Sequence, residues 1–160
     1  MSIERAKRYL AAQGVDLGRV LEFDVSSATV ELAALAVGCA PQRIAKSLSF
    51  RLPSEGGERI LLIIAAGDAK VDNAKYKAQF GGKARMLSHE EAGALIGHDV
   101  GGVCPFGVNE GVEVWLDQSL RRFETVYPAV GSANSAIELS IPELEALSKP
   151  RGWADVCKLP

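Results

Sequence analysis

Hydrophobic and polar positions along the chain recur with two different periods, so both helices and strands are predicted. Apolar residues at helical spacing over 2–14 predict an amphipathic helix that Gly14 ends. Strict alternation over 46–52 predicts a strand with one apolar face. Turn residues at 53–57 followed by an apolar stretch at 59–66 predict a hairpin whose second strand is central in a sheet.

The rest of the chain continues in the same mixed way. Residues 29–37 are apolar almost all round and predict a buried helix, and 71–80 predict a further helix that ends at glycine. The sequences Ser88–Glu91 and Ser140–Glu143 both have the Ser-x-x-Glu pattern of a capping box, which marks a helix start. Short strands are predicted at 19–24, 112–116, 123–127 and 137–139.

These elements predict the fold class. A hairpin together with helical crossovers requires a mixed sheet. Strand and helix do not alternate strictly, which argues against a regular doubly wound fold. We therefore expect an α/β fold with a strongly bent mixed sheet, or half-barrel, with helices packed outside. The length of 160 residues is that of a single domain spanning 1–160.

Composition excludes several classes of protein. Hydrophobic residues make up 48% and charged residues 24%, the balance of a globular protein rather than a disordered one. The longest apolar run is 60–66, far shorter than the roughly 20 residues of a membrane helix. The N-terminal residues carry charge where a signal peptide is apolar, and the three cysteines have no C-x-x-C spacing. These features predict a cytoplasmic protein without a membrane partner, a disulfide framework or a structural zinc site.

The formal net charge is −2, so any contact with nucleic acid must come from a local patch. Positive charge is densest over 70–85, where Lys70, Lys75 and Lys77 are followed by Lys83 and Arg85. This stripe is either a contact surface for RNA or a solvated helix face.

Lys46 is the first candidate for chemistry. It begins the alternating strand on the same face as Leu48, Phe50 and Leu52. A lysine at the head of an apolar face either extends its ammonium past the end of the sheet or lies at the mouth of a pocket. In a pocket, partial loss of solvent would lower its pKa and suit it to stabilising an oxyanion.

Two glycine-containing loops are the next candidates. Residues 101–107 hold three glycines around Pro105 and no charge, so their backbone N–H groups can approach a carbonyl, carboxylate or phosphate. A tight turn is the alternative, and residues 131–135 are likewise either a pocket wall or a turn. A Cys104–His98 nucleophilic pair is conceivable, but no orienting group accompanies it. No cluster has metal-ligand spacing, so neither a metal nor another cofactor is expected.

Four segments together resemble the YbaK/EbsC family of prolyl-tRNA-synthetase-associated editing domains and free-standing aminoacyl-tRNA deacylases. They are Ile44–Phe50, Gly67–Asp72, Gly101–Pro105 and Gly131–Leu139, and the similarity runs from about Ser26 to Leu147. The resemblance implies hydrolysis of the ester between a wrong amino acid and the 3′-terminal adenosine of tRNA. It also implies a YbaK-like fold and a protein that acts in trans.

The family pattern assigns roles to particular residues of this chain. It implies that Lys46 is the catalytic residue and that the 101–105 loop lines the aminoacyl pocket. The substrate-binding residues expected from it are Ser47, Gly101, Gly102, Val103, Cys104, Pro105, Gly131, Ser132 and Asn134. Lys70, Lys75 and Lys77 are the expected tRNA contacts. The expected partners are the acceptor end of a mischarged tRNA and prolyl-tRNA synthetase, with no DNA.

The pocket is expected to take a small amino acid such as Ala, Ser, Cys or Thr. Ser47 and Ala136 stand where the cysteine-specific branch of the family carries threonine and an acidic residue, so cysteine specificity is not implied. Small pockets discriminate such side chains incompletely, because one methylene changes binding by only about 1–3 kcal/mol. The alternative is a non-catalytic module of the same fold that binds aminoacyl-tRNA or an amino acid. A small-ester or thioester hydrolase that uses Cys104 is the second alternative.

Overall fold

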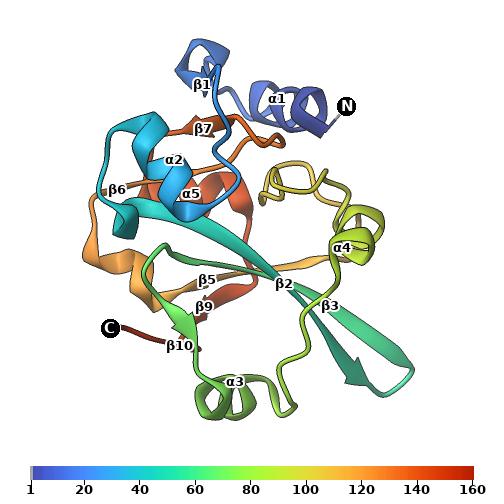
Figure 1. Ribbon diagram of the computed structural model, residues 1–160. Helices are drawn as coiled ribbons and strands as arrows, with labels where there is room; N and C mark the ends of the chain where they lie inside the picture. Colours follow the sequence, from blue (N-terminus) through green and yellow to red (C-terminus); the bar gives the residue numbers. More distant parts are fainter. Residues whose placement is uncertain (1) are drawn as a thin grey trace.

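A computed structural model describes residues 2–160 and shows a curled, mixed six-stranded sheet with helices around it (Figure 1). The strand order is β8-β6-β2-β3-β5-β9. Neighbours pair antiparallel in β2/β3 and β6/β8 and parallel in β2/β6, β3/β5 and β5/β9. The strands of this sheet are β2 (Ile44–Ser54), β3 (Gly57–Ala66), β5 (Glu113–Asp117), β6 (Thr125–Pro128), β8 (Leu139–Ser140) and β9 (Gly152–Ala154). The predicted fold class is confirmed.

Two short antiparallel pairs flank the main sheet. The first joins β1 (Val20–Glu22) to β7 (Ser135–Ile137), and the second joins β4 (Lys70–Val71) to β10 (Cys157–Lys158). The α-helices are α1 (Ser2–Ala12), α2 (Val30–Val37), α3 (Asn73–Phe80), α4 (His89–Ile96) and α5 (Ile141–Ser148). The 3₁₀ helices are η1 (Leu17–Arg19), η2 (Pro41–Arg43) and η3 (Gln118–Arg122). Both predicted capping boxes are present, at the starts of α4 and α5.

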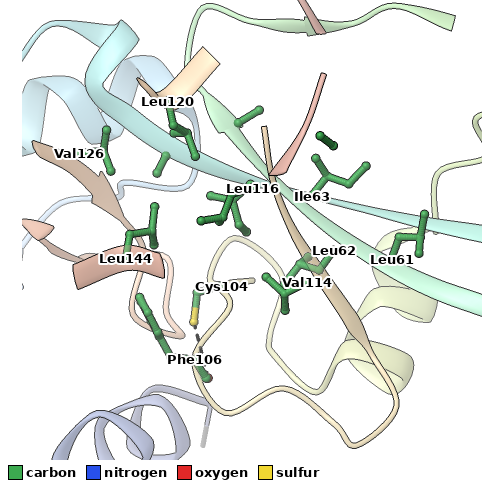
Figure 2. Packing of buried hydrophobic residues seen from close by; sticks show 14 of the residues in the cluster. Leu61, Leu62, Ile63, Cys104, Phe106, Val114, Leu116, Leu120, Val126 and Leu144 are labelled. Carbon is green, nitrogen blue, oxygen red and sulfur yellow. Dashed lines mark hydrogen bonds between the residues drawn. The ribbon is translucent and has the colours of Figure 1, made fainter. Parts of the chain in front are cut away.

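The predicted hairpin of β2 and β3 forms the centre of the molecule. The two strands pair from Ala45↔Ala66 to Ser54↔Gly57, and all residues of 61–66 are completely buried. Figure 2 shows Leu62 of β3 close to Val114, with Cys104 and Phe106 in the same buried cluster. The apolar stretch is buried on both faces because other residues cover each side of a central strand.

Helix α2 is less buried than its sequence predicts. Ala33 and Ala34 pack inward, whereas Leu32 is 42% and Leu35 80% exposed. The expectation of a buried helix is wrong because a single face of α2 contacts the sheet. Apolar composition predicts how much surface could be buried, but the neighbouring elements decide how much is.

Two other local predictions need correction, and two strands were not predicted. Val71 belongs to β4 rather than to a helix, and α3 begins only after the N-cap Asp72, whose side chain accepts from Lys75 N. The predicted strand at 137–139 is two strands, because Glu138 separates β7 from β8 and the two pair with different partners. The strands β9 and β10 had no sequence prediction. None of the helices within 2–160 has the length and apolar character needed to cross a membrane.

Candidate active site

A pocket of about 450 Å³ lies where the N-terminal ends of α2 and α4 approach the first half of β2. Its volume is within the range of small-molecule sites. Its most buried lining residues, each at most 8% exposed, are Ser27, Ala33, Ile44, Ala45, Ser49, Leu87, Ala92, Ser135 and Ala136. Its exposed rim consists of Ala28, Thr29, Met86, Ser88, His89 and Val100. The remaining lining residues are Val30, Lys46, Ser47, Gly101, Val103, Tyr127 and Ala129.

Lys46 lines this pocket and is half-buried. Its Nζ donates a hydrogen bond to the backbone oxygen of Ala69 and another, of 3.3 Å, to that of Gly67. An ammonium group has three protons, so two bonds to the β3–β4 turn leave one for a ligand in the pocket. The lysine therefore lies at the pocket, as one of the two sequence interpretations expected.

The charge state of Lys46 is under opposing influences. Burial lowers the pKa of Lys46 because it penalises the charged form, while negative charge on Cys157 and on Asp68 would raise it. Asp68 is itself held by Arg122, whose Nη2 donates to Asp68 Oδ1 at 2.6 Å. These contacts fix the turn and place the partly desolvated ammonium beside the pocket.

The polar face of β2 points into the pocket rather than to bulk solvent. Ser47 and Ser49 are on the face of the strand opposite to that of Leu48 and Phe50, and both serines line the cavity. Ser49 is 8% exposed, so its surroundings are the pocket and the protein rather than bulk solvent. Ser47 was expected here, whereas Ser49 was not, because an alternating pattern does not show what covers the polar face.

Two helix N-termini border the same pocket. Thr29 caps α2 by accepting from Leu32 N, and Ser88 caps α4 by accepting from Glu91 N, each at 3.1 Å. The N-terminal end of a helix carries partial positive charge. No Asp or Glu is among the pocket-lining residues of the described chain. Acidic residues stand in the first turns of both helices, Glu31 in α2 and Glu90 and Glu91 in α4, so the main positive group that the cavity itself presents is the Lys46 ammonium.

The glycine–proline loop, residues 101–107, contributes only in part to the lining. Gly101 and Val103 border the cavity, while Gly102, Cys104 and Pro105 are buried outside its lining. A Cβ on Gly102 would be 2.3 Å from Ser132 N, so glycine is needed for the loop to touch the 131–135 turn. The loop therefore supports the pocket wall as well as lining it.

Cys104 is fully buried, and its Sγ lies 3.6 Å from His98 Nε2. Burial raises the pKa of the Cys104 thiol to about 12. A neutral thiol that substrate cannot reach is a poor nucleophile. The arrangement argues against a hydrolase that uses Cys104.

The 131–135 turn stands behind the pocket wall. Gly131 is buried with the position of its Cβ 2.5 Å from Ser2 O, and Asn134 is exposed and donates to Phe23 O at 3.0 Å. The hydroxyl of Ser132 donates to Ser135 Oγ at 2.7 Å. Gly131, Ser132 and Asn134 are not pocket-lining residues, whereas Ser135 is.

The predicted tRNA-binding lysines are exposed but differ in their surroundings. Lys75 Nζ bonds to Asp155 and to Cys157 O, so part of its charge is neutralised. Lys70 is close enough to Lys46 to lower the pKa of that ammonium. Lys77 is on α3, which Figure 1 places at the bottom of the view, below α2 and α4.

Sequence reasoning missed several lining residues, among them Ser27, Thr29, Leu87, Ser88 and Tyr127. The Ser88 capping box was a clear signal, but of a helix start and not of a pocket. Segments around 27, 46, 88 and 101 meet only through the tertiary fold. A pattern read along the chain carries no signal for such a meeting.

Comparison with known proteins agrees with this geometry. Residues 24–147 match the family model described as the aminoacyl-tRNA editing domain. A protein of Bacillus subtilis (strain 168), described as "Uncharacterized protein YwhH", is 57% identical over 139 residues, or 87% of each chain. A crystal structure of "a putative trans-editing enzyme for prolyl tRNA synthetase" superposes with a TM-score of 0.83 at 31% identity, covering 98% of this chain and 97% of that one.

The similarity to a complete synthetase is more limited. A proline–tRNA ligase of Bacillus cereus (strain AH820) is 30% identical over 76 residues, which are 47% of this chain and 13% of the ligase. The fold, the pocket and the family match define a tRNA-editing class of protein. The chain belongs to the aminoacyl-tRNA editing domain family, of the YbaK type.

Proposed function

We propose that this protein is a trans-acting deacylase, which hydrolyses the ester bond between a small amino acid and a mischarged tRNA. The observation that carries the proposal is the half-buried ammonium of Lys46 at the pocket, with two of its protons engaged and a third available. The family match supports the substrate class. The relatives associated with prolyl-tRNA synthesis support a tRNA(Pro)-type substrate and prolyl-tRNA synthetase as a partner.

In the proposed reaction, water attacks the ester carbonyl and negative charge develops on its oxygen. Lys46 stabilises this oxyanion with its third proton, and the two backbone carbonyl groups hold the ammonium in place beforehand. The backbone N–H groups of Gly101 and Val103, the two loop residues that line the pocket, are the further donors we propose, because the Gly102 N–H already donates to Asp99 O. The ester C–O bond then breaks, and the ribose oxygen leaves with a proton.

The proton acceptor is proposed to be the substrate itself. No Asp or Glu of the described chain lines the pocket, and His89 is exposed at the rim. An aminoacyl ester has a vicinal ribose hydroxyl that can relay the proton from water. Positioning and oxyanion stabilisation would then be the contribution of the protein.

The proposed amino acids are small, namely Ala, Ser, Cys or Thr. Ala136 and Ser47 line the pocket with short side chains, and Ala45 and Ala92 do the same nearby. We expect hydrolysis of at least one of these four esters and little hydrolysis of Phe or Leu esters. Efficient cleavage of Phe-tRNA would contradict this assignment.

A panel of mischarged tRNAs, assayed with purified protein under single-turnover conditions, tests the function. Lys46→Ala should lower the deacylation rate at least about 100-fold, as the loss of one oxyanion donor does. Lys46→Arg should restore little, because a planar guanidinium does not replace a compact ammonium. Lys7→Ala, on α1 and paired with Glu22, is the matched control and should retain full activity.

A melting curve on each variant separates loss of chemistry from loss of fold. Lys46→Ala should melt within a few degrees of the wild type, because a partly desolvated cation is removed. A folded Lys46→Ala protein with near-normal turnover would exclude the mechanism. A wild-type protein that binds mischarged tRNA without hydrolysing it would be a binding module of the same fold.

A further inference from the structure

The hydroxyl of Ser27 is buried without a hydrogen-bond partner. Within residues 2–160, it and the Tyr76 hydroxyl are the buried side-chain polar atoms that have none. Ser27 is 8% exposed. Leaving a buried hydroxyl unsatisfied is unfavourable, and most such groups in proteins are paired. An unpaired hydroxyl therefore needs a reason, and Ser27, unlike Tyr76, lines the candidate active-site pocket.

The backbone fixes Ser27 in the pocket wall. Its amide donates a 2.6 Å hydrogen bond to Ala133 O, which ties the segment before α2 to the 131–135 turn. The next residue, Ala28, is in turn packed beside Gly101, because its Cβ is 3.2 Å from where a Gly101 Cβ would be. The printed contacts of Ser27 are made by its backbone, so the hydroxyl, which is buried in the pocket wall, has its hydrogen-bonding capacity unused.

The surroundings indicate which kind of ligand group can reach this hydroxyl. In the proposed deacylase, the amino-acid end of the substrate is the part that enters this pocket. Within the described chain, Ser27 is the lining residue whose buried hydroxyl has no hydrogen-bond partner. An aminoacyl group offers two candidates there, the α-ammonium and the side chain.

Electrostatics favours the side chain over the ammonium. The Lys46 ammonium lines the pocket, and the lining within the described chain has no carboxylate to pair with a second cation. Glu31, in the first turn of α2, is near enough to raise the pKa of Lys46 but is not a lining residue. A second cation beside the Lys46 ammonium is disfavoured, whereas a neutral hydroxyl is not. Serine can both donate to and accept from such a hydroxyl.

We propose that Ser27 is a specificity-determining residue whose hydroxyl hydrogen-bonds the side-chain hydroxyl of the aminoacyl group, so that seryl esters are preferred over alanyl esters. This inference rests on the proposed deacylase function and narrows its substrate class to β-hydroxy amino acids. The physical basis is that a site built to hydrogen-bond a substrate hydroxyl discriminates against the analogue that lacks it.

The test compares Ser-tRNA with Ala-tRNA on the same tRNA body, using wild type and Ser27→Ala. We expect wild type to prefer the seryl ester at least about tenfold in kcat/KM, and Ser27→Ala to reduce that preference to less than about threefold. Most of the change should be a loss with the seryl ester. The melting temperature of Ser27→Ala should equal or exceed that of wild type, because the hydroxyl has no protein partner to lose.

Ser148→Ala is the matched control. Ser148 is also buried, but its hydroxyl donates to Leu144 O at 2.6 Å in α5, outside the pocket lining. This variant should melt at a lower temperature and keep the wild-type preference for the seryl ester. A lower melting temperature for Ser27→Ala with unchanged preference would assign Ser27 a structural role and overturn the proposal.

The remaining outcomes separate the inference from the function on which it rests. Equal losses on both esters in Ser27→Ala would mean that Ser27 binds a group common to both, which overturns the side-chain assignment. A wild type that hydrolyses the alanyl ester as well as the seryl ester would overturn the inference and leave the deacylase function standing. A wild type that hydrolyses neither these nor the other small esters would overturn both.

Discussion

Lys46 owes its position at the pocket to two backbone carbonyl groups rather than to an acidic side chain. Those carbonyls belong to the β3–β4 turn, and the turn packs closely on η2 and α2. A Cβ on Gly67 would be 2.1 Å from Pro41 O and 2.8 Å from Val30 Cγ1. Glycine at 67 thus allows the turn to approach closely enough to hold the ammonium.

Gly67→Ala should therefore affect both stability and activity. Backbone atoms must move to admit the methyl group, which should lower the free energy of unfolding by about 1–3 kcal/mol. The displaced carbonyl should also misplace Lys46 and lower the deacylation rate about 10- to 100-fold at temperatures where the protein is folded. Urea unfolding and single-turnover hydrolysis measure the two effects.

Gly93→Ala provides the control for this substitution. Gly93 lies within α4, and the nearest atom to its Cβ position outside the helix is His98 O at 3.8 Å. Alanine there should leave stability unchanged or raise it by about 0.5–1 kcal/mol, because it favours the helix. If Gly67→Ala behaved like Gly93→Ala, close packing of the turn would not be what positions Lys46.

Helix α1 is held to the glycine–proline loop by a buried histidine. His98 is 1% exposed, with Ser2 Oγ 2.7 Å from its Nδ1 and Phe106 O 2.7 Å from its Nε2. Because Phe106 O only accepts, Nε2 carries the proton of the neutral ring, and Nδ1 accepts from the Ser2 hydroxyl. Burial lowers the pKa of His98, so the folded state favours this neutral ring.

Stability should accordingly depend on pH through His98. The folded-state pKa is below the ordinary 6.5, so the unfolded chain binds the proton more readily. The free energy of unfolding should be constant above pH 6.5 and fall as the pH drops from 6.5 through the folded-state pKa, by at most about 1.4 kcal/mol per pH unit. Urea unfolding between pH 5 and 8 measures this slope.

Two histidine variants show which residue causes the pH dependence of the free energy of unfolding. His98→Gln should remove the dependence between pH 5 and 7 at the expense of overall stability. His89→Gln, at the exposed start of α4, should leave it unchanged. A slope that survives His98→Gln would show that another group is responsible.

Helix α3 is the second element with a separable role. Tyr76 and Phe80 attach it to the sheet through a chain of ring contacts, with Tyr76 5.2 Å from Phe50 and Phe80 5.3 Å from Trp115 between ring centroids. Lys75 and Lys77 lie on its exposed surface. The aromatic residues hold the helix in place, which leaves the lysines available for a partner.

Reversing both charges, Lys75→Glu with Lys77→Glu, should weaken tRNA binding. If each lysine contacts a phosphate, the slope of log affinity against log salt should fall by about 1 per contact. The fold should persist, since exposed ion pairs such as Lys75–Asp155 contribute about 0–1 kcal/mol. Filter binding at several salt concentrations measures the slope, with Lys7→Glu as a control on α1.

An unchanged affinity and slope in the double variant would make this surface a solvated helix face. Lys75→Glu with Asp155→Lys restores the ion pair with its charges exchanged. If this variant still binds tRNA weakly, the lost phosphate contact is the cause. If it binds as tightly as wild type, the lost ion pair is the cause.

For the whole molecule, Asp117 at the end of β5 joins the C-terminal segment to the sheet. It is 1% exposed, and its carboxylate accepts from Ser119 N and Val156 N, each at 2.9 Å. Val156 lies between β9 and β10, which pair with the main sheet and with β4. One side chain thus holds both the start of η3 and the C-terminal strands.

Asp117→Ala should be among the most destabilising single changes in the chain. It leaves two buried N–H groups without acceptors, and the free energy of unfolding should fall by about 2–4 kcal/mol. Asp155→Ala, whose side chain is 64% exposed, should change it by less than about 1 kcal/mol. Urea unfolding and proteolysis of the C-terminal segment measure the difference, and similar values for both variants would contradict this role of Asp117.

The local features of this fold were predictable from the sequence. The capping boxes at Ser88 and Ser140, the hairpin turn after Leu52 and the strand that begins with Lys46 are all present. Each depends on residues within about one turn of helix or one pair of neighbouring strands. The lysine and two members of the glycine–proline loop, Gly101 and Val103, are indeed at one pocket.

The tertiary structure decided which side chains share that pocket and which atoms are left unpaired. The Ser27 amide donates to Ala133 O, on a turn more than 100 residues away, while the Ser27 hydroxyl has no partner among the described residues. Leu35 is 80% exposed, since no element within residues 2–160 covers that side of α2. Burial and hydrogen-bond satisfaction depend on segments that are distant along the chain. Local sequence patterns therefore determine the elements, and packing between them determines the chemistry of the site.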